Sequence, residues 1–245
     1  MGCYAASAIT AVTVQNTMGV QAVHPVPIDI LKEQIDSVLS DIGADAVKIG
    51  MLHSSKAVCV VADMIEKYRI KNVVLDPVMV STSGHRLIET DAVNVIKNRL
   101  MPLARVVTPN IPEAEILADC KISGEEDFDD IARKLSSMGN VSVMLKAGHL
   151  DGESLVDYFY NAEDVTVTKL PSKRVYTRNT HGTGCTLSSA LAASLAKGED
   201  LTTAAISAKR YIEQAIISGA EYEIGNGHGP VNHSFDPIKM VGYEI

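Results

Sequence analysis

The 245-residue chain has no tryptophan, three phenylalanines and only four cysteines. The cysteines form no CxxC pair, which disfavours both a zinc knuckle and a disulfide framework. No apolar stretch reaches membrane-spanning length, and the residues after Met1 do not form a signal-peptide pattern. We therefore expect a cytoplasmic protein with reduced cysteines and no membrane partner.

Positive charge is also in short supply. Lys and Arg total 22 against 30 Asp and Glu, which gives a formal net charge of -8 and a pI near 5.3. There is no basic run and no basic patch interleaved with aromatic residues. This composition argues against nucleic acid and anionic membrane as partners.

Apolar residues are abundant, at 46% of the chain, and they recur in an alternating strand and helix pattern. The length suits one α/β domain over residues 1–245. The pattern predicts strands at 7–14, 46–49, 73–75, 106–108 and 141–145, and a hairpin at 155–160 and 164–170. It predicts helices at 29–40, 54–68, 91–100, 113–118, 128–138, 184–197 and 202–219.

Strands that alternate with helices of this length predict a mostly parallel sheet with helices on both faces. Ligands bind such sheets beyond the carboxyl ends of the strands. Polar or small residues follow apolar strands at five points, so we expect them at that edge: Gln15, Gly50, Asp76, Asn110 and Lys146. The polar stretch 81–85 is the best candidate for a mobile flap.

The most informative stretch is residues 179–188, Asn-Thr-His-Gly-Thr-Gly-Cys-Thr-Leu-Ser, which leads into an Ala-rich helix. A helix start leaves N–H groups unpaired and carries the positive end of the helix dipole. Gly182 and Gly184 would let an anion approach closely, such as a phosphoryl group in transfer. Cys185 lies at the same helix start, where the thiolate is favoured and can act as a base. The alternative is a purely structural role, in which the glycines form a tight turn and Cys185 packs at the start of the helix.

Four further polar residues each have two interpretations. Asp76 ends a strand before a proline, as a magnesium or phosphate residue or as a simple turn residue. Asn110 and Glu113 have the spacing of a capping box, and their oxygens also suit Mg²⁺. Lys146 at the tip of a buried strand must reach either an anion or solvent.

Four residues could surround a flat heteroaromatic ring. The amide of Gln15 complements an aminopyrimidine edge, because it both donates and accepts. Met51 and Val78 could form apolar walls, and His181 could contact substrate oxygens. Simple turn and core-packing roles are the alternatives for all four.

Several motifs occur in a characteristic order: 73–79 (Val-Val-Leu-Asp-Pro-Val-Met), 108–115 (Thr-Pro-Asn-Ile-Pro-Glu-Ala-Glu), 144–149 (Met-Leu-Lys-Ala-Gly-His) and 180–185 (Thr-His-Gly-Thr-Gly-Cys). In this order they resemble the ribokinase superfamily of small-molecule kinases. Residues 14–17, 48–52 and 227–231 are similar to its hydroxymethylpyrimidine (phosphate) kinase branch in thiamine biosynthesis. The resemblance covers essentially the whole chain, and Cys185 stands where most other branches have Asp.

The resemblance implies a ribokinase-like fold and ATP- and Mg²⁺-dependent phosphorylation of a pyrimidine hydroxymethyl group and of its monophosphate. It implies that Cys185 is catalytic beside Gly182 and Gly184, and that Asp76, Asn110, Lys146 and Thr183 contact ATP or its phosphates. Glu113 and Asp76 would hold Mg²⁺, directly or through water. Gln15, Met51, Val78 and His181 would bind the pyrimidine, and we expect a homodimer.

Two alternative functions remain, and the chain differs from the family pattern at its N-terminus. Pyridoxal kinases share the Cys-bearing turn, and a non-catalytic ligand-binding or regulatory protein could retain the fold. The family pattern also places a first strand and a Gly-rich turn before the segment that starts at Gly2. We expect this N-terminal part to be absent from the chain given, with activity of residues 1–245 alone in doubt.

Overall fold

The computed structural model describes residues 1–79, 87–148 and 152–240. Its main sheet has six strands in the order β3-β4-β5-β6-β7-β8. The first four strands are parallel to one another, β7 pairs antiparallel with β6, and β8 pairs antiparallel with β7. The strands are β3 (Val47–Ile49), β4 (Val73–Leu75), β5 (Val106–Val107), β6 (Ser142–Leu145), β7 (Ser154–Asn161) and β8 (Thr166–Lys173).

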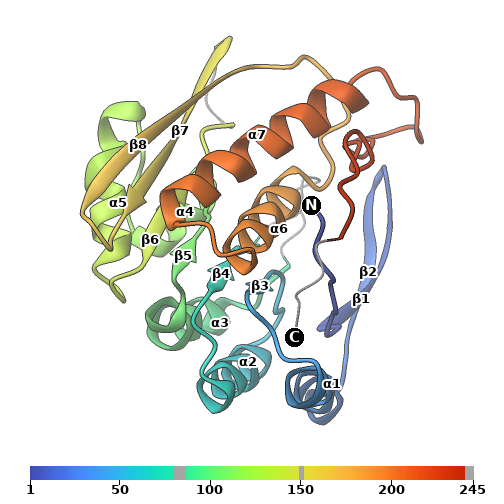
Figure 1. Cartoon of the computed structure of the whole chain (residues 1–245), viewed down its shortest axis with the longest axis vertical. Coiled ribbons are helices and arrows are strands. Elements are labelled where there is room, and N and C mark those ends of the chain that lie inside the picture. Colours follow the sequence, from blue (N-terminus) through green and yellow to red (C-terminus); the bar gives the residue numbers. More distant parts are fainter. Residues whose placement is uncertain (80–86, 149–151, 241–245) are drawn as a thin grey trace.

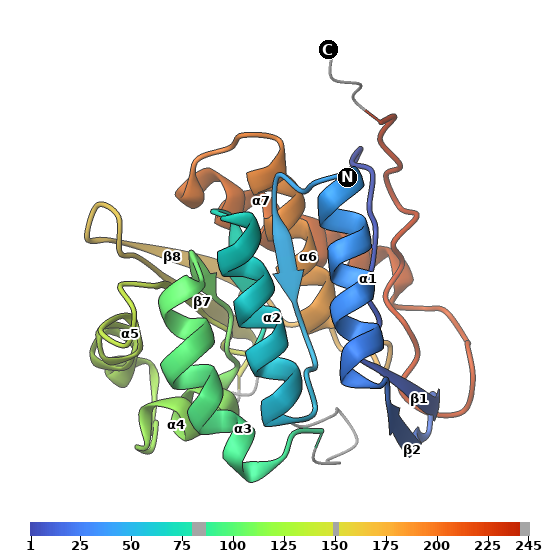
Figure 2. The same ribbon diagram turned by 90° about the horizontal axis from the view of Figure 1, so that it is seen from below.

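Helices cover both faces of this sheet, as the alternation predicted (Figure 1). On one face lie α1 (Ile28–Asp41), α2 (Ser55–Tyr68), α3 (Thr90–Val95), α4 (Ile111–Ala118) and α5 (Phe128–Ser136). On the other lie α6 (Thr183–Ala196) and α7 (Leu201–Gly219). Figure 2, a view from below, shows α1, α2 and α3 side by side. A single π-helical turn, Ile96–Leu100, extends α3.

Side-chain alternation along the strands explains the two layers. Val73 and Leu75 pack against α1 to α5, whereas Val74 between them packs against α6 and α7. The neighbouring strand β5 does the same with Val107 and Val106. Each buried strand therefore presents apolar side chains to both helical layers, as parallel strands in covered sheets do.

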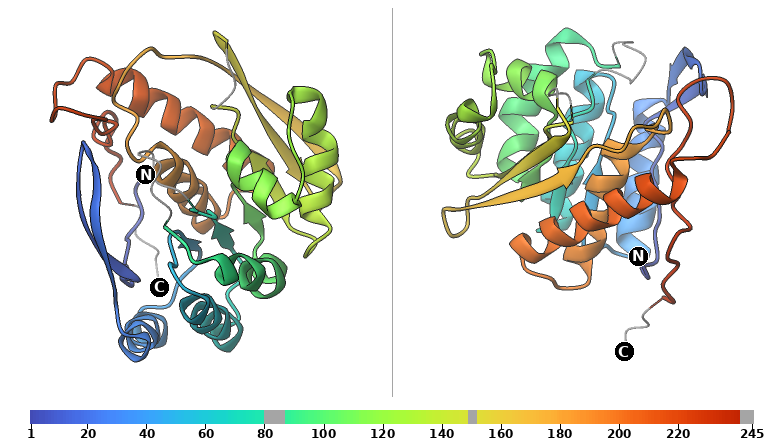
Figure 3. Two further views of the ribbon diagram at one scale, coloured as in Figure 1. Left: turned by 180° about the vertical axis from the view of Figure 1, so that it is seen from behind. Right: turned by 90° about the horizontal axis from the view of Figure 1, so that it is seen from above.

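A separate two-stranded sheet stands beside the main one. It consists of β1 (Ala11–Asn16) and β2 (Gly19–Pro25), which pair antiparallel around a tight turn. Figure 3 shows this hairpin next to the C-terminal segment and away from the six-stranded sheet. The sequence pattern predicted a strand here but no partner for it, because Gly19, His24 and Pro25 interrupt the apolar pattern of β2.

This arrangement corrects one expectation. Gln15 lies in β1 of the hairpin, not at the carboxyl edge of the main sheet where the strand pattern placed it. The remaining elements agree with the predicted ones to within two or three residues, apart from β1, which begins later than expected. The expected flap at 81–85 and His149 of the motif at 144–149 lie outside the described residues. Within the described ranges, no helix has the length and apolarity needed to cross a membrane.

Candidate active site

The turn at the start of α6 forms as the glycine pattern predicted. Gly182 is the N-cap and adopts the left-handed conformation, with φ of 84°, which favours glycine. Thr183, Gly184 and Cys185 make up the first helical turn. Thr183 N–H donates to Thr180 O, but the N–H groups of Gly184 and Cys185 have no hydrogen-bond acceptor among the described residues. Two donors and the positive end of a 14-residue helix are thus available to an anion.

The ammonium group of Lys146 lies against this helix start. A Cβ added to Gly184 would be 3.3 Å from Lys146 Nζ, so a larger residue there would require the ammonium to shift by a few tenths of an ångström. A cation beside the positive end of a helix is electrostatically unfavourable unless negative charge lies nearby. The two positive features together therefore favour binding of a strongly anionic group.

Asp76 supplies part of that negative charge, directly after β4. Its carboxylate is 1% exposed, and Lys146 Nζ lies 3.1 Å from Oδ1. Burial by itself would raise the pKa of Asp76, but the ammonium groups of Lys146 and Lys48 outweigh it and hold the pKa below its usual value. Asp76 is therefore ionised at neutral pH, and it fixes Lys146 by charge.

Glu113 also lies near Lys146, with Oε2 3.9 Å from Nζ. Asn110 and Glu113 form the predicted capping box at the start of α4. Asn110 Oδ1 accepts from Glu113 N–H, and Glu113 Oε2 accepts from Asn110 N–H, both at 2.9 Å. Burial raises the pKa of Glu113, even with Lys146 nearby. The carboxyl is thus less acidic than a surface glutamate.

Burial would lower the pKa of Lys146, but Asp76 and Glu113 reverse the effect and raise it. Lys146 stays charged, and its backbone joins β6 to the start of α4 through a bridge with Asn110. Parallel pairing of β4, β5 and β6 explains why residues 70 positions apart meet here. The strands end at the same edge of the sheet.

Three residues without a predicted role complete the cluster. Lys48 Nζ is 3.7 Å from Asp76 Oδ2. Ser188 Oγ donates to Asp76 Oδ2 at 3.0 Å, and Thr108 Oγ1 donates to Asp76 Oδ1 at 3.3 Å. Two sequence features could have drawn attention to them: Lys48 is a lysine within an apolar three-residue strand, and Ser188 is a serine within an apolar helix. Neither signal identifies the partner, which comes from a distant strand.

The residues expected to bind the ring are only partly brought together. Met51 follows β3, and its carbonyl accepts from Thr10 Oγ1 at 2.7 Å, which connects it to the base of the hairpin. Val78 is half-buried two residues after Asp76. Gln15 and His181 are exposed, and neither side chain has a hydrogen bond to Asp76, Glu113 or Lys146.

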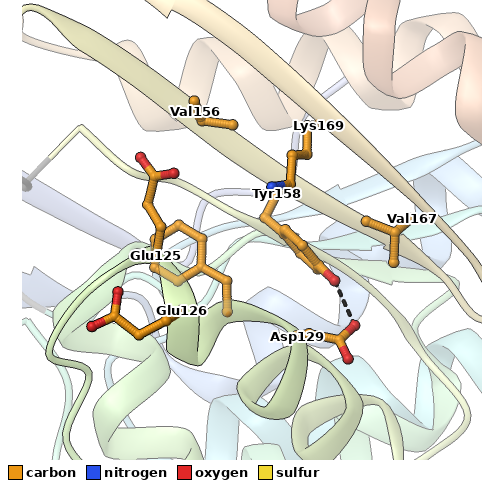
Figure 4. Close-up of a pocket in the computed structure, with 8 residues that line it drawn as sticks. Glu125, Glu126, Asp129, Val156, Tyr158, Val167 and Lys169 are labelled. Carbon is orange, nitrogen blue, oxygen red and sulfur yellow. Dashed lines mark hydrogen bonds between the residues drawn. The ribbon is translucent and has the colours of Figure 1, made fainter.

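A pocket of about 320 Å³ lies elsewhere, between the β7–β8 hairpin and the start of α5 (Figure 4). Tyr158 Oη donates to Asp129 Oδ1 at 2.5 Å in this pocket, where burial and then Asp129 raise the pKa of the tyrosine. None of the predicted site residues lines this pocket. Its lining residues are Glu125, Glu126, Phe128, Asp129, Val156, Tyr158, Val167 and Lys169. The candidate active site is therefore the cluster at the start of α6.

Comparison with solved structures shows the class of fold. Pyridoxal kinase from Staphylococcus aureus in complex with AMP-PCP and pyridoxal is 30% identical, with a TM-score of 0.84, and the match covers 95% of this chain and 83% of that one. The shared ribokinase-like fold and the kinases among its relatives place the chain among the small-molecule phosphotransferases.

The sequence comparisons identify the family. A family model described as phosphomethylpyrimidine kinase matches residues 1–232, so the chain belongs to the phosphomethylpyrimidine kinase family. Hydroxymethylpyrimidine/phosphomethylpyrimidine kinase of Rhizobium meliloti is 45% identical over 95% of this chain and 87% of its own length. The thiamine biosynthesis bifunctional protein ThiED of Geobacter sulfurreducens is 46% identical, and there the chain spans 47% of the relative.

Proposed function

We propose that this chain transfers the terminal phosphoryl group of ATP to 4-amino-5-hydroxymethyl-2-methylpyrimidine and then to the resulting monophosphate. The observation that carries the proposal is the convergence of Lys146 with the unpaired N–H groups of Gly184 and Cys185 at one helix start. This is where negative charge on a phosphoryl group in transfer would be stabilised. The names of the relatives supply the class of acceptor.

In this mechanism Cys185 Sγ accepts the proton of the acceptor hydroxyl, whose oxygen then bonds to phosphorus as the bond to the ADP oxygen breaks. The N–H groups of Gly184 and Cys185 donate to the phosphoryl oxygens. Lys146 neutralises charge on the phosphates, with Asn110 and Thr183 at the same edge. Positioning and charge stabilisation account for most of the catalysis, because phosphoryl transfer leaves little covalent chemistry to the protein.

The described residues fit a magnesium ion held mainly by water and nucleotide phosphates. No group of three or more His, Cys, Asp or Glu side chains that could hold a metal occurs among them. Both oxygens of Asp76 already accept from lysine or hydroxyl donors, so Asp76 would contact the ion through water. Glu113 is the more direct candidate. Mg²⁺ typically keeps several waters and uses one or two carboxylates with substrate phosphates, and there it would neutralise phosphate charge.

Gln15, Met51, Val78 and His181 are the proposed contacts to the pyrimidine. Pyridoxal kinase activity is the second candidate, because the S. aureus relative in complex with pyridoxal shares the fold at a TM-score of 0.84. Both acceptors present a hydroxymethyl group on a flat nitrogen heterocycle, so the glycine-rich turn alone does not separate them.

A substrate panel tests the proposal. The purified chain is incubated with ATP, Mg²⁺ and one acceptor, and ADP release and the phosphorylated product are measured. We expect turnover of the hydroxymethylpyrimidine and of its monophosphate to exceed that of pyridoxal. Preference for pyridoxal would support the second candidate, and nucleotide binding without turnover on any acceptor would support a non-catalytic role.

We further propose a cytoplasmic homodimer. The two-stranded sheet has exposed apolar side chains at Val12 and Val14, which are 56% and 57% exposed, and at Met18 of its turn. An isolated two-stranded sheet is marginally stable, so a second copy could cover it. Light scattering coupled to size exclusion tests this, with Val14→Lys expected to shift the protein toward monomer. The cytoplasm supplies ATP and keeps the four free cysteines reduced.

A further inference from the structure

The motif at residues 227–231 resembles the family, but the proposed mechanism gives it no role. In the structure, residues 227–233 run from the hairpin turn to the first turn of α6, and we call them the C-terminal strap. Figure 1 shows the C-terminal segment running beside the β1–β2 hairpin. The strap is therefore in a position to connect two parts of the site that no other described hydrogen bond joins directly.

At one end the strap holds the hairpin turn. His228 N–H donates to Thr17 O at 2.8 Å, and Gly227 N–H donates to Thr17 Oγ1 at 3.2 Å. These partners are 210 or more residues apart in sequence. Thr17 lies two residues after Gln15, so the strap fixes the end of the strand that carries the proposed pyrimidine contact.

At the other end the strap holds the glycine-rich turn. His181 N–H donates to Gly229 O at 2.9 Å, and His181 forms a parallel bridge with Pro230. His233 Nε2 lies 2.8 Å from Thr186 Oγ1, in the first turn of α6. The strap thus binds on both sides of the Gly182–Cys185 turn.

Asn179 packs against the end of the strap that contacts the glycine-rich turn. It is 1% exposed, and its Nδ2 group donates to the carbonyls of Gly219, Ala220 and Tyr222 at 2.7–3.3 Å. Its Oδ1 has no hydrogen-bond partner among the described residues and faces Gly229, where an added Cβ would lie 2.0 Å away. The end of α7, the strap and the turn are therefore packed around one buried amide.

Gly227 makes the close approach of the strap to the hairpin turn possible. A Cβ on Gly227 would lie 2.1 Å from Thr17 O and 2.6 Å from its carbonyl carbon. No real Cβ contact is that short, and the atoms it meets are backbone, which cannot rotate away. Any side chain at 227 would have to push the hairpin turn off the strap.

From these contacts we propose that the strap is a positioning element, which holds Gln15 of the hairpin in register with the phosphate-binding turn of α6. This inference rests on the proposed function and adds to it how the acceptor and phosphate halves of the site are aligned. The strap acts on the acceptor through the hairpin, and it touches neither Lys146 nor Glu113 through any described hydrogen bond or ion pair. Its loss would weaken acceptor binding more than ATP binding.

The test compares Gly227→Ala with Gly198→Ala, a control at the far end of α6. Gly198 has φ of +84° and nothing within 4 Å of an added Cβ, so the control strains the backbone without touching the strap. For Gly227→Ala we expect the KM for the hydroxymethylpyrimidine to rise about tenfold or more, since two hydrogen bonds are lost. The KM for ATP should stay within about twofold, and the control should leave both KM values near wild type.

Hydrogen exchange of the amides in residues 11–25 gives a readout that does not need activity. Gly227→Ala should accelerate this exchange, and Gly198→Ala should not. Thr17→Val removes the hydroxyl that accepts from Gly227 and keeps the size of the side chain, so it is a milder variant. It should raise the KM for the pyrimidine about threefold. Combined with Gln15→Ala, Gly227→Ala should add no further increase to the acceptor KM.

Unchanged hairpin exchange and acceptor KM in Gly227→Ala would overturn the inference. An equal rise in the KM for ATP and for the pyrimidine would also overturn it, because the strap would then act on the whole fold. If the wild-type chain does not phosphorylate the pyrimidine, the proposed function fails, and the exchange comparison still decides whether the strap holds the hairpin.

Discussion

Asp76 is the side chain whose loss should most disturb the candidate active site. Asp76→Asn keeps the size and removes the charge, so it leaves two ammonium groups without their shared carboxylate. Among the described residues, Lys146 then keeps only Glu113 as an ion-pair partner, at 3.9 Å. Lys48, with 19% of its side chain exposed, can turn partly toward water.

The expected cost follows from this arrangement. Removing one partner of a buried ion pair typically costs about 3–5 kcal/mol, because the remaining charge is buried without compensation. Glu113 and the exposure of Lys48 reduce the penalty, so we expect about 3 kcal/mol in the free energy of unfolding. For a chain of this length that corresponds to a melting temperature lower by about 6–12 °C.

The pH dependence has a definite sign. The pKa of Asp76 is lowered in the folded state, so its contribution to stability is present above the ordinary pKa of 3.8 and is lost as pH falls through the folded pKa. The pKa of Lys146 is raised, so its contribution is present below 10.5 and is lost as pH rises through the folded pKa. The stability difference between wild type and Asp76→Asn should be largest between these limits.

Urea unfolding of wild type and Asp76→Asn at pH 7 measures the cost, and unfolding near pH 3 measures how far the cost is lost in acid. Asp36→Asn is the control, because Asp36 pairs with Lys67 on the surface and is 43% exposed. We expect no measurable change in its midpoint. A cost below about 1 kcal/mol for Asp76→Asn at pH 7 would show that Lys146 and Lys48 do not depend on this carboxylate.

The remaining predictions concern catalysis and the glycine-rich turn. Cys185→Ala should keep nucleotide binding and reduce kcat by about 10²–10⁴-fold, the usual contribution of a general base; near-normal turnover would mean that the thiol only packs. Lys146→Ala should raise the KM for ATP, and Glu113→Gln should shift the activity curve to higher Mg²⁺; unchanged titrations would leave only structural roles for both. Gly182→Ala should lower stability by about 1–2 kcal/mol in thermal unfolding, because its φ of 84° is left-handed.

Local sequence determined much of the fold and one half of the site. Apolar strands such as Val73–Leu75 and the alternating helices predict a covered parallel sheet, since their periodicity reports which faces are buried. The Gly182–Cys185 turn and the Asn110–Glu113 capping box were also predictable, because each depends on residues within a few positions of one another.

Only the tertiary structure decided the partners of these groups. Sequence placed Gln15 on the edge of the main sheet, but β1 pairs with β2 instead, because strand pairing depends on long-range register. Lys48 and Ser188 meet Asp76 from β3 and α6, and Gly227 meets Thr17 across 210 positions. Contacts of this kind are set by how strands order and helices pack, and no local pattern in the chain encodes which distant residue will be the neighbour.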